Sequence, residues 1–103
     1  MGIFDAFTKG SSADSIQEYL DKGAVVIDVR TIEEYEEGHV KGSKNIVLDT
    51  LPDHVETIKS LDKPVITVCR SGARSGTAES FLANQGIDVI NGGPWNHVAP
   101  LVK

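Results

Sequence analysis

Residues 65–75 read VITVCRSGARS, an uninterrupted apolar run followed by a turn that contains Gly72. A continuous apolar run, unlike an alternating one, is typical of a strand that is buried on both faces of a parallel sheet. The glycine lets the chain bend sharply where such a strand ends. Beyond the turn, Ala78 and Leu82 recur at the spacing of one helical face, and Gly86 is a typical helix stop. The stretch therefore predicts a buried strand, a tight turn and a helix, the unit from which α/β folds are built.

Similar signals alternate along the rest of the chain. Helices are predicted to begin after Ser12, Thr31 and Thr50, and the two threonines also have an acidic residue three positions later. Further apolar runs predict strands at residues 24–27, 45–48 and 87–90. Because alternating strands and helices are joined by right-handed crossovers, we expect a mostly parallel sheet of about four or five strands with helices on both faces. The domain is placed at residues 12–103, and residues 1–11 are interpreted as a lead-in segment.

Composition limits the possible partners. The 103 residues include 10 basic and 15 acidic side chains, so the formal net charge is −5. This balance counts against a nucleic-acid-binding protein, which needs clustered Lys and Arg residues against the phosphates. No apolar run approaches the ~20 residues of a membrane span, and the N-terminus lacks the features of a secretory signal. We expect a small soluble domain of the cytoplasm that binds neither nucleic acid nor membrane.

The single cysteine, Cys69, is predicted to lie at the carboxyl end of a central strand, where α/β sheets bind ligands. It precedes a helix N-terminus, whose free N–H groups and dipole favour negative charge. Arg70 and Arg74, two of only three arginines in the chain, flank the same turn. Because such surroundings stabilise thiolates, we predict that Cys69 is a nucleophile acting on an anionic substrate. The alternative is an inert core cysteine, which is difficult to combine with two arginines in one turn.

Three segments carry motifs that occur together in a known family. The first is the turn itself, residues 69–75, which reads CRSGARS. The second is Asp28-Val29-Arg30 followed by residues 34–35 and 38–43, and the third is Gly92-Gly93 with Trp95. Taken in their order and spacing along the chain, over residues 12–98, these motifs resemble those of the rhodanese, or thiosulfate sulfurtransferase, family.

The resemblance implies a rhodanese-like fold and a two-step sulfur transfer. The Cys69 thiolate would take the outer sulfur of thiosulfate as a persulfide, release sulfite, and pass the sulfur to cyanide or to a small or protein thiol. The remaining loop residues would bind the substrate through backbone N–H groups, guanidinium groups and hydroxyls; they are Arg70, Ser71, Gly72, Ala73, Arg74 and Ser75. No metal or other cofactor is expected, because the lone cysteine and the three histidines lack metal-ligand spacing.

Two other functions stay open from the sequence. A rhodanese-like domain can be a non-catalytic persulfide carrier or protein-binding module, although the presence of Cys69 favours an enzyme. A small cysteine-dependent phosphatase is the weaker alternative, since those enzymes place five residues between the cysteine and the arginine. Here four residues separate Cys69 from Arg74, which predicts a smaller loop, better matched to a sulfur atom than to a phosphate.

Several other polar residues have structural interpretations. Asp28, Arg30 and Glu34 are predicted to form an ion-pair network beneath the ligand crevice rather than an acid–base set. His39 is expected to fix a turn through a hydrogen bond. Trp95 suits the mouth of the pocket, where it would line the pocket or dock an acceptor protein, or the core.

Overall fold

The computed structural model describes residues 10–103. At its centre lies a four-stranded sheet with the order β2-β1-β3-β4. Every pair of neighbouring strands in this sheet is parallel. The strands are β1 (Val25–Asp28), β2 (Lys44–Asn45), β3 (Val65–Cys69) and β4 (Val89–Pro94). This is the α/β architecture that the alternation of strands and helices predicts.

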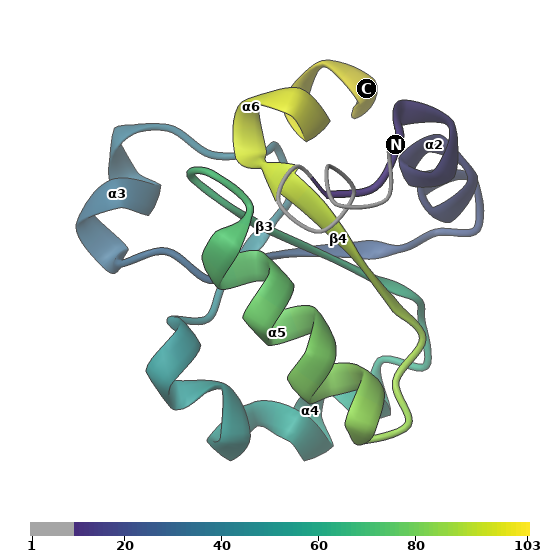
Figure 1. The fold of residues 1–103 in the computed structure, drawn as a ribbon, viewed down its shortest axis with the longest axis vertical. Coiled ribbons are helices and arrows are strands. Elements are labelled where there is room, and N and C mark those ends of the chain that lie inside the picture. The colour runs from purple at the N-terminus through teal and green to yellow at the C-terminus, as the bar shows by residue number, and fades with distance from the viewer. Residues whose placement is uncertain (1–9) are drawn as a thin grey trace, which may run out of the picture.

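Helices cover both faces of the sheet (Figure 1). They are α2 (Ala13–Asp21), α3 (Ile32–Glu37), α4 (Val55–Ser60), α5 (Ala73–Asn84) and α6 (Trp95–Val98), with short 3-10 helices at Leu48–His54 and Ala99–Leu101. Helices α4 and α5 lie on one face, and α2 and α6 lie on the other. Within residues 10–103, no helix is both long enough and apolar enough to cross a membrane.

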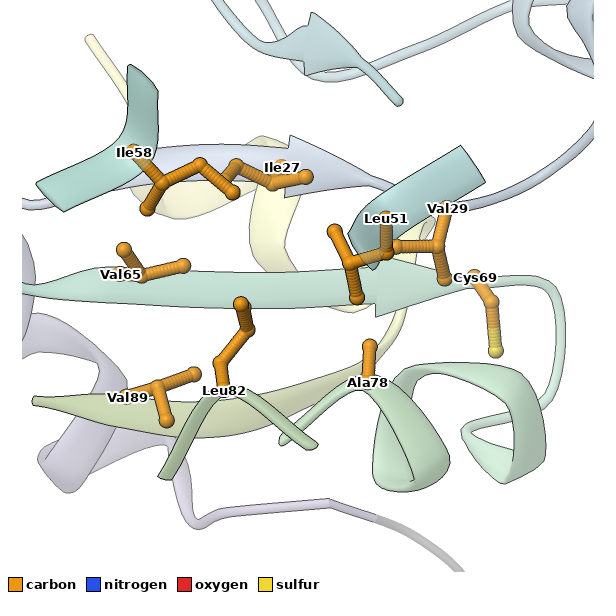
Figure 2. Close-up of a cluster of buried hydrophobic side chains, with 9 residues drawn as sticks. All are labelled: Ile27, Val29, Leu51, Ile58, Val65, Cys69, Ala78, Leu82 and Val89. Carbon is orange, nitrogen blue, oxygen red and sulfur yellow. The ribbon is translucent and has the colours of Figure 1, made fainter. Parts of the chain in front are cut away.

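Strand β3 lies between two apolar clusters, one on each face of the sheet. On one face, Val65 packs with Leu82 of α5 and its neighbours (Figure 2). On the opposite face, Ile66 packs with Ile16 of α2 and Val98 of α6. All five residues of β3 are buried. At about 1.5–3 kcal/mol for each buried aliphatic side chain, this packing fixes the strand that ends in the cysteine.

Two of the predicted helix starts are confirmed. Ser12 is the N-cap of α2, and its hydroxyl accepts a hydrogen bond from the Ser15 N–H (3.2 Å). Thr31 and Glu34 form a capping box at the start of α3. In this box the Thr31 hydroxyl accepts from the Glu34 N–H (3.2 Å), and the Glu34 carboxylate accepts from the Thr31 N–H (3.0 Å).

The region after β1 differs from the prediction in two ways. The strand expected at residues 45–48 is only Lys44–Asn45, and a 3-10 helix begins at Leu48. The capping box expected at Thr50 is also wrong, because Thr50 lies inside this 3-10 helix and its hydroxyl donates to the Val47 carbonyl (2.8 Å). Pro52 has no N–H to donate and interrupts a regular α-helix, so α4 begins only at Val55.

The last strand lies further along the chain than the apolar run at residues 87–90 predicts. Ile87 still belongs to the turn that ends α5, since its N–H donates to the Leu82 carbonyl (3.1 Å). The strand instead continues through the glycines to Pro94, with a register shift opposite Thr67 and Val68. A side chain at Gly92 would meet the backbone of β3, because its Cβ would lie 2.9 Å from the Thr67 carbonyl oxygen. The glycine therefore serves close strand packing rather than a turn.

The proposed lead-in falls mostly on residues 1–9, which lie outside the described residues. Of its last residues, Ser11 donates from its N–H to the Asn91 carbonyl of β4 (2.7 Å). The division of the chain at residue 12 stays a prediction.

Candidate active site

Cys69 is the last residue of β3, at the carboxyl end of the sheet, and a short turn leads from it into α5. Its side chain has 0% exposure. Figure 2 shows the sulfur directed toward the first turn of α5, beyond the apolar cluster that Leu51 and Ala78 help to form. The thiol thus stands at the edge of the core, with hydrocarbon on one side and the polar turn on the other.

The turn presents hydrogen-bond donors to this sulfur. The N–H groups of Gly72 and Ser75 donate to Cys69 Sγ at N···S distances of 3.0 and 3.4 Å. The Ser75 hydroxyl, which is fully buried, lies 3.3 Å from the same atom. Gly72 has φ of +101°, a left-handed conformation that favours glycine and that turns its N–H toward the sulfur. The result is a concave set of donors of the kind that binds an anion.

These donors lower the pKa of the thiol. Burial is the largest single influence and raises the pKa of Cys69, because a thiolate is poorly solvated away from water. Hydrogen bonds from the Ser75 hydroxyl and from the N–H groups of Ser75, Gly72 and Ser71 act in the opposite direction. Their combined effect prevails, so the pKa of Cys69 lies below its ordinary value. The site favours a thiolate without a neighbouring general base.

Two polar residues hold the turn in this shape, and neither was identified from the sequence. The Thr67 hydroxyl donates to the Ser75 carbonyl (2.9 Å). The side-chain amide of Asn91, which is 3% exposed, donates to the Gly72 carbonyl (3.1 Å) and accepts from the Gly93 N–H (2.8 Å). The available signal was a polar side chain within each of two otherwise apolar strand segments, since buried polar groups need partners.

The two loop arginines face a carboxylate of α3. The Arg74 guanidinium makes a bidentate ion pair with Glu34, with N···O distances of 2.8 and 3.0 Å. Arg70 adds a third contact, from Nε to the same carboxylate, at 3.1 Å. The Arg74 guanidinium, followed by the Thr31 N–H, holds the pKa of Glu34 well below its usual range. The same ion pair raises the pKa of Arg74.

This arrangement corrects one prediction. Glu34 is not part of an ion-pair network with Asp28 and Arg30, because it pairs with Arg70 and Arg74 of the turn after β3. The capping box explains the difference, since it fixes Glu34 in the first turn of α3, on the side that faces the turn after β3. Ala73 and Ser71 are both exposed.

The ion pair expected between Asp28 and Arg30 is present and buried. The Arg30 guanidinium contacts both carboxylate oxygens of Asp28, the shortest N···O distance being 2.7 Å, and donates to the Gly38 carbonyl (2.6 Å). The Arg30 guanidinium lies over the Trp95 ring, with its Cζ 4.9 Å from the ring centroid. Trp95 also packs against the core cluster of α2 and α6. Of the roles considered for Trp95, which were lining the pocket mouth, docking an acceptor protein and packing in the core, the contacts support core packing.

His39 has the structural role expected of it. Its Nδ1 lies 2.7 Å from the Tyr35 carbonyl oxygen, and the two rings stack with their centroids 3.8 Å apart. The Tyr35 hydroxyl in turn donates to the Ser43 carbonyl (2.7 Å), which ties α3 to the chain leading into β2.

Comparisons with known proteins agree with this geometry. The sequence model of the Rhodanese-like domain family matches residues 12–94. The chain belongs to the rhodanese-like domain family. A thiosulfate sulfurtransferase GlpE of Stutzerimonas stutzeri (strain A1501) is 35% identical over 83 residues, which cover 76% of this chain and 75% of that protein. The uncharacterized protein YqhL of Bacillus subtilis (strain 168) is 41% identical over 67 residues, which are 65% of this chain and 52% of that protein.

Solved structures show the same rhodanese-like fold. The crystal structure of reduced Bacillus anthracis CoADR-RHD superposes with a TM-score of 0.74 and 31% identity. The match covers 97% of this chain but only 18% of that larger chain. A rhodanese-related protein of Thermoplasma volcanium gives a TM-score of 0.72 at 26% identity, over 92% of this chain and 95% of that one.

The rhodanese-like domain has the groups needed for nucleophilic chemistry at sulfur. An ionised thiol at the end of a rigid strand can attack an electrophilic sulfur, and the donors around Cys69 can hold negative charge on the sulfur that remains. The nearby arginines are partly accessible, with 37% exposure for Arg74 and 62% for Arg70.

Proposed function

We propose that this protein is a sulfurtransferase that moves sulfane sulfur from thiosulfate to a thiol or cyanide through a persulfide on Cys69. The observation that carries the proposal is the set of donors on the Cys69 sulfur, two backbone N–H groups and the Ser75 hydroxyl within 3.4 Å. Family membership and the relatives named thiosulfate sulfurtransferase support the same chemistry.

In the first half-reaction, the Cys69 thiolate attacks the outer sulfur of thiosulfate. The S–S bond of thiosulfate breaks, and its electron pair leaves on sulfite. One negative charge on the thiolate and two on thiosulfate become one on the Cys69 persulfide and two on sulfite, so no proton is required. The hydrogen bonds that lower the pKa of Cys69 favour the thiolate, which is the attacking form.

In the second half-reaction, an acceptor nucleophile attacks the outer sulfur of the persulfide. A new bond forms between the acceptor and that sulfur, the persulfide S–S bond breaks, and the Cys69 thiolate is regenerated. With cyanide the product is thiocyanate, and with a thiolate it is a new persulfide. The N–H groups of Gly72 and Ser75 serve both steps, because the charge returns to the sulfur they already contact.

The protein would act in a compartment such as the cytoplasm, where thiols stay reduced, because the mechanism needs Cys69 as a thiolate. Within it the physiological acceptor would be a small thiol or the thiol of another protein.

A persulfide carrier without useful turnover is the second candidate, and one observation favours it. Cys69 has no exposed surface, so a donor or acceptor reaches the sulfur only after the turn moves. A carrier would accept sulfur slowly and keep it until a specific partner opens the turn.

Intact-mass measurement after treatment with thiosulfate tests the proposal. The protein should gain the mass of one sulfur atom, lose it again on addition of cyanide, and gain nothing in the Cys69→Ser variant. An unmodified mass for the wild-type protein would overturn both candidates. Steady-state production of thiocyanate separates them, because a carrier becomes loaded without turning over.

A further inference from the structure

Resting on the proposed function, we infer that Glu34 sets which sulfur donors the site accepts, by occupying the arginine pair that would otherwise bind the sulfonate end of thiosulfate. A doubly charged donor must displace the Glu34 carboxylate before it reaches these guanidinium groups. A sulfur donor with less charge at its sulfonate end binds the two guanidinium groups less strongly, so its affinity depends less on displacing Glu34. Glu34 is thus a positioning residue that acts through Arg70 and Arg74.

The contacts show how fully the carboxylate uses the arginines. Both Glu34 oxygens are engaged, one with Arg74 Nη1 at 2.8 Å and the other with Arg74 Nη2 at 3.0 Å and Arg70 Nε at 3.1 Å. A fork of two parallel N–H donors is the geometry with which arginine binds carboxylate, phosphate or sulfonate oxygens. A planar carboxylate therefore already fills the fork that a substrate oxyanion needs.

The position of this ion pair makes the competition specific to the active site. Arg74 lies one residue before Ser75, whose hydroxyl and N–H contact the Cys69 sulfur, and Arg70 follows Cys69 directly. An anion whose outer sulfur lies against Cys69 would place its charged oxygens at this same turn, where the charge of Cys69 already acts on the Arg74 guanidinium. In the resting protein the charge of one of the two arginines is cancelled by Glu34.

A single substitution can remove the charge and keep the local structure. Glu34→Gln retains the capping box of α3, because glutamine can occupy this position and accept from the Thr31 N–H. It also retains an oxygen that can accept from one arginine. The matched control is Glu33→Gln, which removes the same charge from an exposed neighbouring position on the same helix.

The kinetic test compares two donors that carry the same sulfane sulfur. Methanethiosulfonate has a methyl group in place of one thiosulfate oxygen and therefore one negative charge fewer. In Glu34→Gln we expect the KM for thiosulfate to fall about 5- to 10-fold, the scale of losing a bidentate, partly exposed ion pair. The KM for methanethiosulfonate should change less than about 2-fold, as should kcat for both donors. Glu33→Gln should leave the ratio of the two KM values unchanged.

A binding measurement tests the inference even where no sulfur is transferred. Sulfate does not react with Cys69, but when bound by the arginines it should slow alkylation of Cys69 by iodoacetamide. The half-protecting concentration of sulfate should fall about 5- to 10-fold in Glu34→Gln and stay constant in Glu33→Gln. A half-protecting concentration that stays constant or rises in Glu34→Gln, or equal KM changes for both donors, would overturn the inference. Absence of persulfide in the wild-type protein would overturn only the proposed function.

Discussion

Replacement of Ser75 by alanine isolates the contribution of one side chain to the ionisation of Cys69. The Ser75 hydroxyl is buried and lies 3.3 Å from the sulfur, and it lowers the pKa of Cys69. A hydrogen bond to a charged group contributes about 1.5–3 kcal/mol, and sulfur is a weak acceptor, so the lower end applies. Because one pKa unit corresponds to about 1.36 kcal/mol, the pKa of Cys69 in Ser75→Ala should rise by about one unit.

The assay is the rate of Cys69 alkylation by iodoacetamide as a function of pH. Only the thiolate reacts, so the midpoint of the profile reports the pKa of Cys69. The rest of the donor set survives the change, since the Ser75 N–H and the bond from Thr67 to the Ser75 carbonyl involve the backbone. Ser71→Ala is the matched control, because it removes an exposed hydroxyl from the same turn and should leave the midpoint in place.

An unchanged midpoint in Ser75→Ala, with the variant folded as judged by thermal unfolding, would refute this explanation. The thiolate would then depend on the backbone N–H groups alone. A lower midpoint would mean that the Ser75 hydroxyl accepts a hydrogen bond from the thiol and thereby stabilises its neutral form.

Three further predictions concern stability. The pKa of Cys69 is lower in the folded state than in the unfolded state, so between these two pKa values the unfolded chain binds more protons. The urea midpoint of the wild type should therefore rise with pH up to the ordinary thiol pKa, and this rise should be absent in Cys69→Ala. Arg30→Met leaves the buried Asp28 without its ion-pair partner and should lower the free energy of unfolding by about 3–5 kcal/mol. Arg70→Met breaks an exposed ion pair and should lower it by less than about 1 kcal/mol. Equal losses of the two variants in urea titrations would contradict the burial of Arg30. Gly92→Ala would place a Cβ 2.7 Å from the Ile66 side chain of β3 and should lower the free energy of unfolding by about 1–3 kcal/mol through overpacking. Gly23→Ala should cost less, because the space around Gly23 is open and only its left-handed backbone is strained. Thermal unfolding of the two variants tests this order.

Much of the fold could be predicted because its signals are local. The continuous run of β3, the Ser12 cap and the Thr31 capping box each depend on a few consecutive residues, and each is present in the structure. The shortened β2 and the displaced β4 could not be predicted this way. Pairing with β1 decides where β2 ends, and close approach to β3 decides that glycines belong to β4.

In the candidate site, too, residues close together in the sequence could be predicted and partners distant in the sequence could not. The proposed nucleophile and its backbone donors lie within one turn, so a local sequence pattern singled out Cys69, Gly72 and Ser75, which the structure brings together. The partners that come from elsewhere in the chain were missed or assigned to the wrong group. Glu34 contacts Arg74 across 40 positions, and Asn91 reaches Gly72 across 19, distances over which no single-sequence pattern carries information.

The full burial of Cys69 separates two properties that are often treated as one, ionisation and accessibility. The observed rate of any modification is the product of how often the turn opens and how fast the uncovered thiolate reacts. A low thiol pKa raises the second factor, whereas the closed turn lowers the first, and most strongly for bulky electrophiles. Opening of the turn, and not only the pKa of the thiol, therefore decides which reagents modify Cys69, and small anions need a smaller opening than bulky oxidants or alkylating agents.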